Sequence, residues 1–167
     1  AAGKLAREVA DGFMKEHPDR TIFVAGSVGP TNKTASMSPD VSDPAYRAVT
    51  YLDLYSAYKE QVDALVDGGV DIVLFETTFD TLNVKAGLEA AEAVLKEKGK
   101  DLPIMLSLTL SAQGGRTFSG QTLLAFLASV QHTNIVSVGL NCSFGAADMK
   151  PFLAELAKHA PYYISAY

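Results

Sequence analysis

The chain has 167 residues, of which 48% are hydrophobic and 20% charged, and this composition excludes a disordered segment and fits a globular domain. Its 19 acidic residues outnumber 14 basic ones, and the net charge of -5 disfavours a nucleic-acid partner. No apolar run reaches the roughly 18 residues of a membrane span. The single cysteine excludes an internal disulfide and favours a cytoplasmic location.

The first part of the chain combines one helical period, one strand and one long loop. Residues 2–16 carry apolar residues at four-residue spacing, beginning with Leu5 and Val9, which predicts an amphipathic helix. A short apolar run over residues 21–26 predicts a strand buried on both faces, as in parallel sheets. Residues 27–48 hold three prolines and no clear period, which predicts a loop of functional length.

The remaining sequence repeats strand and helix signals in strict alternation. The predicted helices cover residues 51–67, 82–98, 121–131 and 148–159. The predicted strands cover residues 71–76, 103–110, 135–141 and 162–167. This order implies a parallel sheet with right-handed crossovers.

Two architectures fit such an order, an open doubly wound sheet and part of a (β/α)8 barrel. The open sheet usually begins with a strand and a glycine-rich phosphate turn, and this chain begins with a helix. A complete barrel needs about 250 residues. We therefore expect an α/β fold that is a partial (β/α)8 TIM barrel, with about five parallel strands, and residues 1–167 as a fragment of one domain.

Polar residues collect at or near the carboxyl ends of the predicted strands, where TIM barrels build their active sites. They are Glu76, Ser107, Thr109, Asn141 and Cys142. A carboxylate in such a place can also cap a helix, and a free cysteine is often a small buried hydrophobe. One thiol cannot complete a zinc site. From these residues alone the sequence predicts an enzyme-like polar rim and no specific reaction.

A glycine-rich segment over residues 114–120 precedes the fourth predicted helix. It lacks the spacing of a P-loop, so a structural turn with Ser119 or Thr122 at the helix N-cap is the better interpretation.

Several segments resemble the homocysteine-binding region of cobalamin-dependent methionine synthase, in collinear order over nearly the whole chain. They are residues 24–36, 40–49, 68–77, 116–122 and 139–142. The long GPTNKTASMSPD stretch points to the cobalamin-dependent enzyme rather than to its shorter homocysteine-methyltransferase relatives.

The resemblance implies a (β/α)8 barrel that binds zinc through three cysteines and holds homocysteine as a zinc thiolate. That thiolate takes the methyl group of methylcobalamin to give methionine, and methyltetrahydrofolate bound by another domain remethylates the cobalamin. Cys142 matches the first zinc ligand. The family's other two ligands form a Cys-Cys pair that is absent from this sequence. We therefore expect an internal fragment with an incomplete zinc site, inactive by itself and without a catalytic residue of its own.

The resemblance also suggests substrate-binding residues. Glu76 matches the family's acid near the homocysteine amino group, and a carboxylate facing an ammonium is a charge-assisted hydrogen bond. Asn141 precedes the metal ligand and can position it or the substrate. Ser107 and Thr109 are weaker candidates. The expected partners are homocysteine and the cobalamin and methyltetrahydrofolate domains of the same full-length chain, with no nucleic acid and no membrane.

Two alternatives stay open. The parent protein can be a cobalamin-independent homocysteine methyltransferase that uses a sulfonium or betaine donor, or the chain can be a non-catalytic small-molecule-binding module with an open sheet. An incomplete barrel also exposes strand edges, which are templates for self-association.

Overall fold

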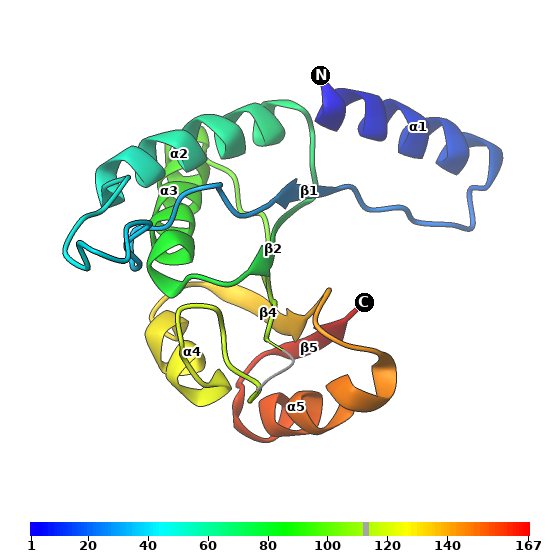
Figure 1. The fold of residues 1–167 in the computed structure, drawn as a ribbon. Helices are drawn as coiled ribbons and strands as arrows, with labels where there is room; N and C mark the ends of the chain where they lie inside the picture. Colours follow the sequence, from blue (N-terminus) through cyan, green and yellow to red (C-terminus); the bar gives the residue numbers. More distant parts are fainter. Residues whose placement is uncertain (112–113) are drawn as a thin grey trace.

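A computed structural model describes residues 1–111 and 114–167, and it contains five helices and five strands in alternation (Figure 1). The helices are α1 (Ala2–Glu16), α2 (Tyr51–Asp67), α3 (Thr81–Lys98), α4 (Leu123–Val130) and α5 (Ala146–His159). The strands are β1 (Ala25–Val28), β2 (Ile72–Thr78), β3 (Ile104–Leu108), β4 (Ile135–Leu140) and β5 (Tyr163–Ala166).

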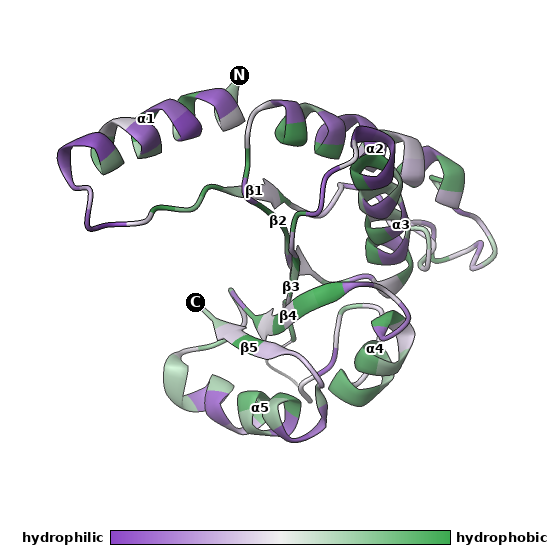
Figure 2. Ribbon diagram, turned by 180° about the vertical axis from the view of Figure 1, so that it is seen from behind, coloured by the Kyte–Doolittle hydropathy of each residue, from purple (hydrophilic) through white to green (hydrophobic). Residues whose placement is uncertain are grey.

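The five strands form one parallel sheet in the order β1-β2-β3-β4-β5. Each strand pairs with the next one in sequence, so crossovers of a single hand bring every connecting helix to the same face. Helices α2 to α5 accordingly lie outside a curved sheet whose other face is open (Figures 1 and 2). A doubly wound sheet reverses its strand order at a switch point. The fold is thus an α/β fold of the partial TIM-barrel kind, as predicted.

The hydrophobic core lies between the outer face of the sheet and the helices. Side chains alternate between the two faces of a strand, and Val73 and Phe75 of β2 are 0% and 2% exposed against the helices. Helix α3 approaches this layer closely at Gly87, where an added Cβ would come within 2.5 Å of the Phe75 ring. A side chain at position 87 would therefore push α3 away from the sheet.

The helix limits follow from side-chain caps that satisfy free backbone N–H groups. Thr50 and Asp53 form a capping box at the start of α2, and Asp80 accepts hydrogen bonds from two N–H groups of α3. Thr122 caps α4, which confirms the structural interpretation of that turn. Within the described residues, no helix is both long and apolar enough to span a bilayer.

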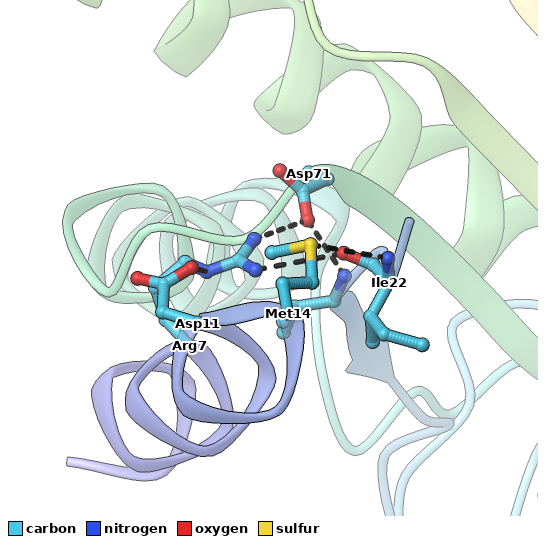
Figure 3. Close-up of polar contacts among 6 residues, drawn as sticks. Arg7, Asp11, Met14, Ile22 and Asp71 are labelled. Carbon is cyan, nitrogen blue, oxygen red and sulfur yellow. Dashed lines mark hydrogen bonds and ion pairs between the residues drawn. The ribbon is translucent and has the colours of Figure 1, made fainter. Parts of the chain in front are cut away.

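The first strand begins later than predicted. The sequence places it at residues 21–26, whereas β1 begins at Ala25, which lies opposite Ile72 at the start of β2. The N–H of Ile22 donates to the sulfur of Met14 in α1 at 3.3 Å (Figure 3). The apolar run is therefore longer than the part of it that finds a strand partner.

Helix α1 lies beside the edge of the sheet, and an ion pair connects the two (Figure 3). The Arg7 guanidinium contacts Asp71 at 2.6 Å, and the same carboxylate accepts the N–H of Val24 at 2.7 Å. The predicted helix is confirmed, but its apolar residues Leu5 and Val9 remain 63% and 65% exposed. Amphipathic spacing identified the helix without showing what its apolar side contacts.

Candidate functional site

The open, concave face of the sheet carries the side chains that alternate with the buried core positions. On β2, Glu76 follows Phe75 and therefore points to this face, at the carboxyl end of the strand. On β1, Ser27 pairs with Leu74 and shares that orientation. The predicted strand-end rim is thus built from neighbouring strands whose ends lie at one side of the sheet.

Glu76 is held by hydroxyl groups from two other parts of the sheet. The Ser27 hydroxyl donates to its Oε1, and the Tyr167 hydroxyl donates to its Oε2 at 3.0 Å. Ser27 comes from the adjacent strand, whereas Tyr167 directly follows β5 and reaches back across β4 and β3. The carboxylate stays partly accessible, so it can still accept a hydrogen bond from a ligand.

The phenol of Tyr167 contacts Glu76 and is also influenced by Cys142. Tyr167 is 56% exposed, and partial burial, together with the nearby Glu76, raises the pKa of Tyr167 to about 12. Burial is the largest cause; the hydrogen bond and negative charge of Glu76 and a contribution from Cys142 act in the same direction, while the Ser107 hydroxyl opposes them. Both Glu76 and Cys142 therefore influence the pKa of Tyr167.

Asn141 occupies the centre of a buried polar network between the strand ends. Its Oδ1 accepts the backbone N–H of Thr77 at 3.0 Å and the hydroxyl of Ser107 at 2.8 Å. Its Nδ2 donates to Thr77 Oγ1 at 2.9 Å and to Cys142 Sγ at 3.2 Å. The backbone donor fixes which end of the amide is oxygen, so the opposite end must present its N–H groups to Thr77 and Cys142.

Thr109 completes this network from the other side. Its hydroxyl donates to the backbone oxygen of Asn141 at 3.0 Å, and the N–H of Asn141 donates to Leu108 O at 2.9 Å. Ser107 and Asn141 are 0% exposed and Thr109 is 9% exposed. Of the residues singled out from sequence, these three hold the strand ends together, while Glu76 and Cys142 remain accessible.

The backbone is strained at two positions beside Asn141. Thr77 has φ of 57° and Cys142 has φ of 56°, both in the left-handed region. For non-glycine residues this region costs about 1–2 kcal/mol, and such strain clusters at functional sites. Asn141 bonds to the side chains of both strained residues, so one buried amide maintains the two turns.

Cys142 places an exposed thiol just after β4. Exposure and a fixed N–H donor suit a thiolate that binds a metal or a ligand. The described residues contain no group of three or more His, Cys, Asp or Glu side chains placed to hold a metal ion. This part of the chain therefore offers Cys142 as one soft donor and does not supply a full ligand set by itself.

The loop between β1 and α2 is held against the start of α3 by hydrogen bonds to one side chain. Asn83 in the first turn of α3 is 4% exposed, and its Nδ2 donates to Thr31 Oγ1 at 3.1 Å and to Lys33 O at 2.8 Å. Its Oδ1 accepts the N–H of Ala35 at 2.9 Å. Three hydrogen bonds from one buried side chain thus anchor the first part of the loop.

Sequence reasoning missed Ser27, Thr77 and Tyr167. Alternation along the observed strands places Ser27 and Tyr167 on the same face as Glu76, so a correct strand register finds both. Nothing in the local sequence marks Thr77, whose positive φ and hydrogen bond to Asn141, 64 residues away in sequence, come from the structure.

The whole chain, residues 1–167, matches the family model for homocysteine S-methyltransferase, and the chain belongs to this family. Three solved structures of the homocysteine methyltransferase MmuM from Escherichia coli share its fold. The apo form is 22% identical with a TM-score of 0.76, over 98% of this chain and 55% of that one. The metallated form is 23% identical with a TM-score of 0.73, over 98% of this chain and 54% of that one. The oxidized form is 23% identical with a TM-score of 0.71, over 98% and 53% respectively.

At these identities the structures establish the fold. The chain spans about half the length of the proteins that it matches.

Proposed function

We propose that this chain is part of the homocysteine-binding barrel of a cobalamin-dependent methionine synthase. In the intact protein it binds L-homocysteine and presents its sulfur as a thiolate to methylcobalamin, and the product is methionine. Membership in the homocysteine S-methyltransferase family supports the acceptor substrate. The GPTNKTASMSPD stretch supports the cobalamin-dependent enzyme in particular.

One observation carries the proposal: an accessible carboxylate and an accessible thiol stand at the same end of the sheet, and both influence the Tyr167 phenol. Homocysteine has an ammonium group at one end and a thiol at the other. Glu76 would accept a charge-assisted hydrogen bond from the ammonium. Cys142 would supply a soft donor at the end of the site where the substrate sulfur is activated.

Cys142 would be one ligand of a catalytic zinc ion, and the other ligands would come from residues outside this sequence. Zinc removes the proton from a thiol that coordinates it, and the thiolate is the nucleophile. The chain's own contribution is to hold the Cys142 sulfur in place. Asn141 does this through the 3.2 Å contact from Nδ2, with Ser107 and Thr109 keeping that amide and its backbone fixed.

Homocysteine thiol is mostly protonated near neutral pH, so a site without its full metal ligand set activates it poorly. We therefore expect the isolated chain to retain no stoichiometric zinc at low micromolar metal and to form no methionine. Zinc analysis after gel filtration measures the first quantity. A tightly bound ion at one per chain would contradict the incomplete-site proposal.

The test of function compares methyl donors in the intact natural protein. We expect methionine to form from L-homocysteine with methylcobalamin and not with a sulfonium or betaine donor. Cys142→Ala should abolish zinc retention and turnover. The control Ala57→Ser, at an exposed position of α2, should leave zinc retention and turnover unchanged. Turnover with betaine or a sulfonium compound would favour the cobalamin-independent relatives. No turnover with any donor would favour a binding module.

A further inference from the structure

The Glu76 carboxylate has hydrogen-bond donors on both oxygens before any ligand is present. Ser27 on β1 supplies the donor to Oε1, and Tyr167 after β5 supplies the donor to Oε2 at 3.0 Å. The two donors come from opposite edges of the five-stranded sheet. The side chain of Tyr167 therefore reaches Glu76 across the concave face of the sheet, over β4 and β3.

This arrangement matters because a glutamate side chain is flexible. A free glutamate loses up to about 2 kcal/mol of rotamer entropy when a ligand fixes it. Two hydroxyl donors fix the carboxylate in advance, which is preorganisation for a cation. Each carboxylate oxygen has two lone pairs, so a position remains open on both oxygens after Ser27 and Tyr167 have bound.

Tyr167 is suited to act as a permanent donor. Its hydroxyl donates to Glu76 Oε2 at 3.0 Å, and an unperturbed phenol, with a pKa of about 10, is protonated at neutral pH. Ser107 and Cys142 also face the phenol. The hydroxyl thus contacts the carboxylate end of the site directly.

We propose that Tyr167 is a positioning residue: with Ser27 it holds the Glu76 carboxylate toward the ammonium group of homocysteine and so selects substrates that carry an amino group. The inference rests on the proposed function and adds a determinant of specificity to it. Tyr167 acts through Glu76 and takes no part in methyl transfer.

The test uses the intact natural protein and two methyl acceptors, L-homocysteine and its des-amino analogue 4-mercaptobutanoate. Tyr167→Phe removes only the hydroxyl. We expect it to raise KM for L-homocysteine about 5- to 20-fold with kcat nearly unchanged. KM for 4-mercaptobutanoate should not change, because that acceptor has no group for Glu76. Ser27→Ala should shift the two KM values in the same pattern.

The matched control is Tyr163→Phe, which removes a hydroxyl from β5, the strand that Tyr167 follows, at a residue that is 83% exposed. It should leave both KM values as in the wild type. In a Glu76→Gln background, Tyr167→Phe should have little further effect, because the two residues act as one unit.

The possible results separate the inference from the proposed function. A wild type that uses L-homocysteine, with a Tyr167→Phe variant that matches it, overturns the inference and leaves the function in place. An equal rise in KM for both acceptors, or a fall in kcat alone, also overturns it, because positioning through Glu76 predicts neither. A wild type that cannot use L-homocysteine overturns both.

Discussion

Replacing Asn141 by alanine should destabilise the chain far more than a typical polar substitution. The side chain is 0% exposed and makes four hydrogen bonds. Alanine leaves the N–H of Thr77 and the hydroxyl of Ser107 without their acceptor. It also removes both hydrogen bonds that Asn141 makes to Thr77, whose φ is 57°.

The magnitude follows from the groups that lose their partner. A buried polar group left unsatisfied costs about 1–3 kcal/mol. Ser107 is fully buried and belongs at the upper part of this range, whereas Thr77 is partly exposed and belongs at the lower part. Together they give a loss of about 3–4 kcal/mol in the free energy of unfolding, a large part of the usual 5–15 kcal/mol.

The assay is equilibrium urea unfolding of the chain, followed by far-ultraviolet circular dichroism. The matched control is Asn134→Ala, at an exposed position whose backbone N–H donates to Glu92, a bond that the substitution keeps. That variant should stay within about 0.5 kcal/mol of the wild type. A loss below about 1 kcal/mol for Asn141→Ala would refute the argument that this amide holds the strand ends together.

Three further outcomes test other parts of the structure. Gly139→Ala should cost about 3 kcal/mol in urea unfolding, because the new Cβ would lie 2.1 Å from the backbone oxygen of Ser165; wild-type stability would show that β5 is not packed as described. Asn83→Ala should speed hydrogen exchange of the Ala35 amide at least about tenfold, and unchanged exchange would mean that the loop is anchored elsewhere. Burial raises the pKa of Tyr51 to about 12, above its value of about 10 in an unfolded chain, so this phenol stabilises the fold below pH 10 and the effect is lost between pH 10 and 12. Tyr51→Phe should flatten the decline of unfolding free energy over that interval, and an equally steep decline would contradict the shift.

Local patterns were sufficient to predict the architecture. Continuous apolar runs identified the inner strands, and glycines such as Gly99, with φ of 60°, marked helix ends. The alternation of strand and helix then fixed the parallel order, which placed Glu76 and Cys142 at one end of the sheet. These features depend on short stretches of sequence and on the handedness of crossovers.

The parts that sequence could not supply depend on contacts between distant segments. Tyr167 reaches Glu76, 91 residues away in sequence, only because the sheet curves. The start of β1 was misplaced because Ile22 contacts α1 instead of a strand. Asn141 was expected near the substrate, and its complete burial became clear only from the network around it. The positioning role expected for Asn141 stays a prediction.

In the proposed site, Glu76 would bind the ammonium end of homocysteine and a zinc ion ligated by Cys142 would bind its sulfur. Calorimetric titration of the metal-replete intact protein with L-homocysteine tests this most directly. Below the pKa of a free thiol, about 8.5, binding as a thiolate should release close to one proton per substrate. We predict that Glu76→Gln weakens the affinity and keeps this proton release, whereas Cys142→Ala abolishes the release. Proton release that persists in Cys142→Ala, or an affinity that Glu76→Gln leaves unchanged, would contradict the account.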